Sequence, residues 1–107
     1  MNEIKLNIDF IASETRIIEG PEDIKDEIRI ICNDINQRIS GIEFKEKDVL
    51  LSLIGRDIEK FDELIQKIEE NEKSKKLFFL LITHVADIKF LFLTPEEQAS
   101  LIKEMNW

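Results

Sequence analysis

The sequence predicts a mainly helical α+β domain in which an N-terminal β-hairpin packs on a small bundle of about four helices. Three observations support this prediction: an alternating pattern near the start of the chain, two isoleucine-rich series with helical spacing, and a nearly continuous apolar stretch at 77–93. The alternative is an all-α bundle with an extended N-terminal arm. With 107 residues, 43% of them hydrophobic, the chain is expected to form a single domain over residues 1–107.

Residues 4–10 alternate strictly between apolar and polar side chains. The apolar members are Ile4, Leu6, Ile8 and Phe10. A period of two is typical of a half-buried β-strand, and residues 16–19 are expected to return as a short second strand. Because an isolated hairpin is only marginally stable, it must lie on helices or recruit a third strand from residues 42–44 or 88–93.

Two apolar series with spacings of three and four residues predict helices near 21–40 and 48–71. The first series is Ile24, Ile28, Ile31, Ile35 and Ile39, and the second is Ile54, Ile58, Phe61, Ile65 and Ile68. Pro21 suits the first turn of a helix, and Gly41 is expected to end it. Gly55 lies inside the second series, where it either weakens one helix by roughly 1 kcal/mol or separates two.

The apolar stretch 77–93 fits two conformations. It can form a helix from residue 73 to about Asp87, or two strands joined by a turn at 84–87. That turn contains no Gly, Pro or Asn, and this absence favours a helix over 73–87.

A last helix is predicted over residues 95–105. Thr94 and Glu97 have the spacing of a capping box, and Pro95 suits the first turn. Trp107, which closes the sequence, is expected to serve as an anchor for a binding partner.

The net charge of −8 is unevenly distributed. Residues 1–72 carry 10 Lys+Arg against 19 Asp+Glu, a net charge of −9, and residues 73–107 carry 5 against 4, a net charge of +1. An acidic surface repels nucleic acid and anionic membranes and attracts a basic protein, although it also serves solubility alone. The candidate partner-binding residues are Glu22, Asp23, Asp26, Glu27, Glu59, Asp62, Glu63 and Trp107.

The expected function is that of a small, non-enzymatic, protein-binding regulator or inhibitor with a basic protein as its partner. An inhibitor of a basic nucleic-acid-binding protein, encoded by a phage or mobile element, fits this description, and so does an immunity or antitoxin-type neutralising protein. A second hypothesis is a structural homo-oligomer such as a homodimer. It rests on the apolar residues, which exceed what one small core can enclose.

A third hypothesis is a small metal-binding protein or enzyme centred on His84, the single histidine, together with Asp87 and Cys32. A zinc site needs about four ligands, however, so we predict no metal, no cofactor and no catalytic residue. The single cysteine excludes an internal disulfide and is expected to be a buried thiol in a reducing compartment.

The sequence predicts a cytoplasmic protein with no membrane span. The first ten residues lack the basic and apolar layout of a signal peptide. The stretch 77–93 is too short and too polar to cross a bilayer.

Overall fold

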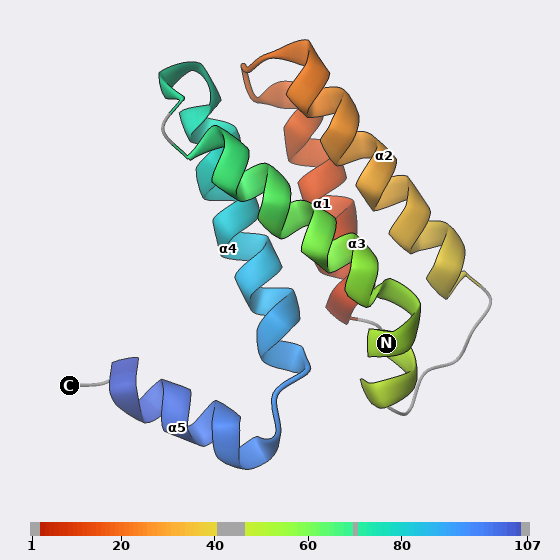
Figure 1. Cartoon of the computed structure of the whole chain (residues 1–107), viewed down its shortest axis with the longest axis vertical. Helices are drawn as coiled ribbons and strands as arrows, with labels where there is room; N and C mark the ends of the chain where they lie inside the picture. Colours follow the sequence, from red (N-terminus) through yellow and green to blue (C-terminus); the bar gives the residue numbers. More distant parts are fainter. Residues whose placement is uncertain (1–2, 41–46, 70, 106–107) are drawn as a thin grey trace.

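The computed structural model describes residues 3–40, 47–69 and 71–105, which form five α-helices and one 3₁₀ helix (Figure 1). The elements are α1 (Glu3–Ile17), α2 (Glu22–Ile39), α3 (Lys47–Ile68), η1 (Glu72–Ser74), α4 (Lys75–Leu91) and α5 (Pro95–Met105). These described ranges contain no β-strand. The helical character is therefore confirmed, whereas the predicted α+β class is wrong.

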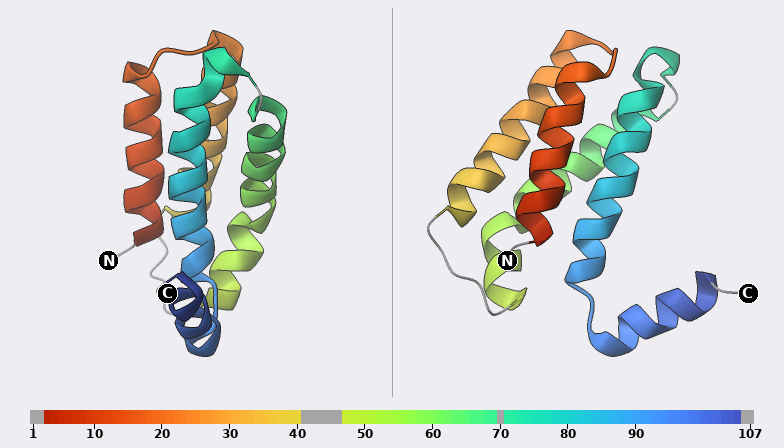
Figure 2. Two further views of the ribbon diagram at one scale, coloured as in Figure 1. Left: turned by 90° about the vertical axis from the view of Figure 1, so that its left-hand side faces the viewer. Right: turned by 180° about the vertical axis from the view of Figure 1, so that it is seen from behind.

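Helices α1 to α4 run alternately up and down and form a four-helix bundle (Figures 1 and 2). Helix α1 packs against α2 and α4, and α3 packs against the same two helices. Helix α5 leaves the lower end of α4 and points away from the bundle (Figure 1). The core therefore lies among the first four helices.

The two predicted apolar series form the inner faces of α2 and α3. All five isoleucines of the first series are buried, and the second series is buried except for Ile65, which is half-buried. Gly55 lies within the continuous helix α3, so it does not separate two helices. Gly41, which was expected to end the first of these helices, lies outside the described residues.

The predicted N-terminal hairpin is wrong because residues 4–10 belong to α1. The buried residues of α1 are Ile4, Ile8, Ile11 and Thr15, with spacings of four, three and four. Leu6 and Phe10, which the alternating pattern placed with Ile4 and Ile8, are 58% and 48% exposed. Of the alternative, the all-α bundle is confirmed within the described ranges, whereas the extended N-terminal arm is wrong for the same reason.

The other predicted strand segments also differ from strands where the structure describes them. Residues 16 and 17 end α1, residues 18 and 19 connect α1 to α2, and residues 88–91 belong to α4. The segment 42–44 lies outside the described residues. The apolar residues of α1 are buried against α2 and α4.

Helix α4 settles the conformation of most of the apolar stretch, because it continues through Leu91 without a turn at 84–87. The predicted capping box of the last helix is also confirmed. The backbone N–H of Glu97 donates to Thr94 Oγ1 at 3.1 Å, and the Thr94 N–H donates to Glu97 Oε1 at 3.1 Å. In the part of the chain that the structure describes, no helix combines the length and apolarity needed to cross a membrane.

Candidate functional site

Helices α2 and α3 lie side by side and share an open hollow on their outer face. The hollow is lined by Glu27, Ile30 and Ile31 of α2 and by Lys60, Glu63, Leu64 and Lys67 of α3. Ile30 is 60% exposed, whereas Ile31 and Leu64 are buried. An exposed apolar side chain within a charged rim resembles the anatomy of a protein–protein contact.

Two carboxylates of this face remain available to a partner. Glu59 and Glu63 lie one turn apart on the outer side of α3, and both are exposed. Neither forms an ion pair with another residue in the described ranges. In contrast, Glu27 Oε1 lies 3.6 Å from Lys67 Nζ and joins α2 to α3.

Several of the predicted partner-binding carboxylates are paired with cations of the same molecule. These pairs are Glu22 with Lys25, Asp26 with Arg29, Glu27 with Lys67 and Asp62 with Lys89. Exposed ion pairs of this kind contribute at most about 1 kcal/mol each to stability. They nevertheless neutralise part of the surface that was predicted to be acidic.

The eight predicted residues do not form one site. Glu27 and Glu63 line the hollow between α2 and α3, and Glu59 lies one turn away from Glu63. Asp62 instead faces α4, where its Oδ1 accepts a 2.6 Å hydrogen bond from Lys89 Nζ. Asp23 is exposed at the first turn of α2, near Glu22, and Trp107 lies outside the described residues.

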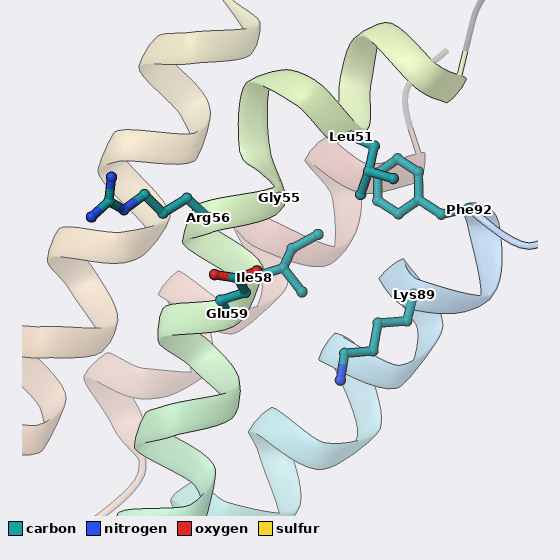
Figure 3. A pocket seen from close by; sticks show the side chains of 7 residues that line it. All are labelled: Leu51, Gly55, Arg56, Ile58, Glu59, Lys89 and Phe92. Atoms are coloured by element: carbon teal, nitrogen blue, oxygen red, sulfur yellow. The ribbon is translucent and has the colours of Figure 1, made fainter.

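A second hollow lies between α3 and α4 (Figure 3). Its lining is Leu51, Gly55, Arg56, Ile58, Glu59, Lys89 and Phe92. Leu51 of α3 and Phe92, which follows α4, both belong to this lining (Figure 3). Glu59 thus lines the hollow between α3 and α4, and it lies one helical turn from Glu63, which lines the hollow between α2 and α3.

Ile30 was not among the partner-binding residues predicted from the sequence. The buried series of α2 uses Ile31, so Ile30 projects from the polar side of the same amphipathic helix. The available signal was that Ile30 interrupts the spacing of the series. In α2 the series occupies the buried face, so the Ile30 side chain is left on the outside of the helix.

His84 links α4 to α1. Its Nδ1 lies 3.0 Å from Asn7 Oδ1, and its ring centroid lies 4.5 Å from that of Phe10. Asp87 and His84 both line an open hollow between α1 and α4. These contacts give His84 a packing and hydrogen-bonding role between the two helices.

Cys32 lies apart from His84, on α2, in a hollow bordered by α1. Burial, reinforced by the Asp9 carboxylate, raises the pKa of the Cys32 thiol to about 12. A thiol of this kind is a poor nucleophile and metal ligand. Across the described ranges, no three His, Cys, Asp or Glu residues gather as ligands for a metal ion.

Comparisons of the chain with protein-family models, curated proteins and solved structures find no match.

Proposed function

We propose that this protein is a non-enzymatic regulator or inhibitor that binds a basic protein through the face shared by α2 and α3. The observation that carries the proposal is the exposed Ile30 side chain in a hollow whose rim includes Glu63. Ile30 supplies apolar contact, and Glu59 and Glu63, which form no ion pair with another described residue, supply negative charge for cations of a partner, beside a rim that also contains Lys60 and Lys67.

The partner is expected to present a basic amphipathic helix. One apolar side chain of that helix covers Ile30, and Lys or Arg side chains pair with Glu59 and Glu63. These two glutamates are four residues apart, so a helix carrying cations at the same spacing matches them. The net charge of −8 adds long-range attraction for a basic protein.

The same binding mode serves two kinds of regulator. An inhibitor encoded by a phage or mobile element would cover the basic surface that its target uses to bind nucleic acid. An immunity or antitoxin-type protein would cover the basic surface of a toxin. Both roles require binding alone.

The test is affinity capture from the source organism followed by measurement of the purified complex by calorimetry. Wild type is expected to retain a basic protein at low salt and release it as salt rises, because salt screens exposed charges. Ile30→Ser is expected to weaken binding by roughly tenfold or more, since burying an isoleucine contributes about 1.5–3 kcal/mol. The double variant Glu59→Gln/Glu63→Gln is expected to weaken it and to reduce its dependence on salt.

The matched control is Glu19→Gln/Glu72→Gln, which removes two exposed carboxylates from elsewhere on the molecule. It removes the same two negative charges but leaves the α2–α3 face intact, so binding is expected to stay near the wild-type value. Equal weakening by both double variants would show that only total charge matters. Capture that is unchanged by Ile30→Ser would contradict the proposed face.

A further inference from the structure

The outer face of α4 carries a row of apolar residues, beside which Thr83 and Asp87 are also exposed. Phe79, Ile82, Ala86 and Phe90 lie along one side of the helix at spacings of three and four residues. Phe79 and Ile82 are 55% and 41% exposed, Ala86 is also exposed, and Phe90 is half-buried. An exposed apolar row of this kind on a soluble helix is typical of a surface that a partner covers.

Helix α5 projects outward from the bundle on the same side as this face of α4. In the left view of Figure 2, α4 stands in front between α1 and α3, and α5 extends from its lower end toward the viewer. Gln98 Nε2 donates a 2.9 Å hydrogen bond to the carbonyl of Phe90, which turns one side of α5 toward α4. Leu101 and Ile102 follow Gln98 on that side at helical spacing, and both are exposed.

The charges at the two ends of this surface have opposite signs. Lys75 and Lys76 are exposed at the start of α4 and form no ion pair with another described residue. Helix α5 carries three acidic residues and one basic residue. All three acids are exposed, and Glu97 belongs to the capping box, which leaves Glu96 and Glu104 for a contact with another molecule.

We propose that a second copy of this chain covers the outer face of α4 and forms a two-fold symmetric dimer. The two α4 helices pack antiparallel, and α5 of each copy lies across the first turn of α4 in the other. This arrangement brings the acidic α5 onto Lys75 and Lys76, and the two-fold axis makes the contact twice. A parallel arrangement would place α5 against α5 and lysines against lysines.

The lengths of the helices fit this arrangement. Helix α5 has 11 residues, and at about 1.5 Å per residue it spans roughly 16 Å. A helix with its side chains is about 10–12 Å wide, so α5 reaches across the α4 of a second copy. The surface involved is separate from the α2–α3 face, and the dimer therefore presents two copies of that face.

The first experiment is size-exclusion chromatography with light scattering. Wild type is expected to show twice the chain mass of 12.6 kDa, and Phe79→Glu is expected to show the mass of one chain. The matched control Val49→Glu places the same charge at another exposed apolar position, on α3, and is expected to remain dimeric. Circular dichroism establishes that each variant is folded.

The second experiment exchanges the charges. Lys75→Glu/Lys76→Glu and Glu96→Lys/Glu104→Lys are each expected to weaken the dimer by tenfold or more, because each places like charges at both contacts. An equimolar mixture of the two variants is expected to form a heterodimer, because both contacts then have opposite signs again. The second variant leaves the Thr94–Glu97 capping box intact.

Three results would overturn the proposal. One is a wild-type protein that remains monomeric at high concentration. The same conclusion would follow if a different protein, rather than a second copy, covered the α4 face. Another is a dimer that Phe79→Glu leaves unchanged. The last is a charge-exchange mixture that stays as monomeric as its two components.

Discussion

Arg38 Nε donates a 2.8 Å hydrogen bond to Asp57 Oδ2 and thereby joins α2 to α3 at the edge of the core. The Asp57 side chain is only 1% exposed, whereas that of Arg38 is 47% exposed. Asp57 Oδ1 accepts no hydrogen bond within the described part of the molecule. The negative charge of the buried Asp57 carboxylate is therefore compensated by a single guanidinium group, that of Arg38.

Removing the arginine is expected to destabilise the fold. Arg38→Ala leaves Asp57 buried without its cation and should lower the free energy of unfolding by about 1–3 kcal/mol. Adding Asp57→Leu to Arg38→Ala should recover part of this loss, because the buried charge is then absent. Urea denaturation of the wild type, both single variants and the double variant measures the coupling. If the two single substitutions lowered the free energy of unfolding additively in the double variant, Arg38 and Asp57 would not be coupled, which would contradict this prediction.

Gly20 permits a close approach between the α1–α2 connection and α4. A Cβ atom at this position would lie 2.5 Å from Cδ1 and 3.2 Å from Cγ of Leu77, which is fully buried. Gly20→Ala is therefore expected to lower the free energy of unfolding by about 1–3 kcal/mol, the usual cost of overpacking. Denaturant unfolding measures this change.

The same substitution at Gly55 is expected to have the opposite effect. There the nearest atom to an added Cβ is Leu51 Cδ1 at 3.6 Å, an ordinary contact distance. Alanine is favoured over glycine within a helix, so Gly55→Ala should raise the free energy of unfolding by roughly 0.5–1 kcal/mol. If both substitutions raised, or both lowered, the free energy of unfolding, the packing described for one of these glycines would be wrong.

Cys32 makes stability depend on pH in the alkaline range. Its pKa is raised from 9.0 to about 12 by burial and by the Asp9 carboxylate. Below pH 9 the thiol is protonated in both states. Between about pH 9 and 12 the unfolded chain loses this proton and the folded chain keeps it, which lowers stability by up to about 1.4 kcal/mol per pH unit. Cys32→Ala should flatten this decline in urea titrations, and an identical decline in both proteins would contradict it.

Leu6 and Ile8 distinguish the helix from the predicted strand. An alternating strand places both side chains on the same face, whereas α1 buries Ile8 completely and exposes Leu6. Ile8→Ala is expected to cost about 2–5 kcal/mol, and Leu6→Ala less than about 1 kcal/mol. Similar costs in thermal unfolding would support the strand.

The error at α1 has a physical cause in the apolar pattern itself. A spacing of four fits both a helix and a strand, so Ile4 and Ile8 do not separate the two. Ile11, which follows Ile8 by three, belongs to the helical pattern alone. The longer series of α2 contains one such odd step and that of α3 contains two, and those helices were predicted correctly.

The candidate site was less predictable because it depends on tertiary neighbours. The ion pairs of Glu27 with Lys67 and of Asp62 with Lys89 join residues that are far apart in the sequence. Without the packing of α2, α3 and α4, nothing distinguishes these carboxylates from Glu59 and Glu63. The surplus of apolar residues was visible in the sequence, but its location on the outer face of α4 required the bundle.

Native mass spectrometry of the captured complex tests most directly whether the two faces bind different partners. Wild type is expected to yield two copies of this chain together with the basic protein. Ile30→Ser should retain the two copies and lose the basic protein, whereas Phe79→Glu should retain the basic protein on a single copy. A variant that loses both interactions would contradict the assignment of separate functions to the α2–α3 and α4–α5 surfaces. The assignment would also be contradicted if both variants kept both interactions.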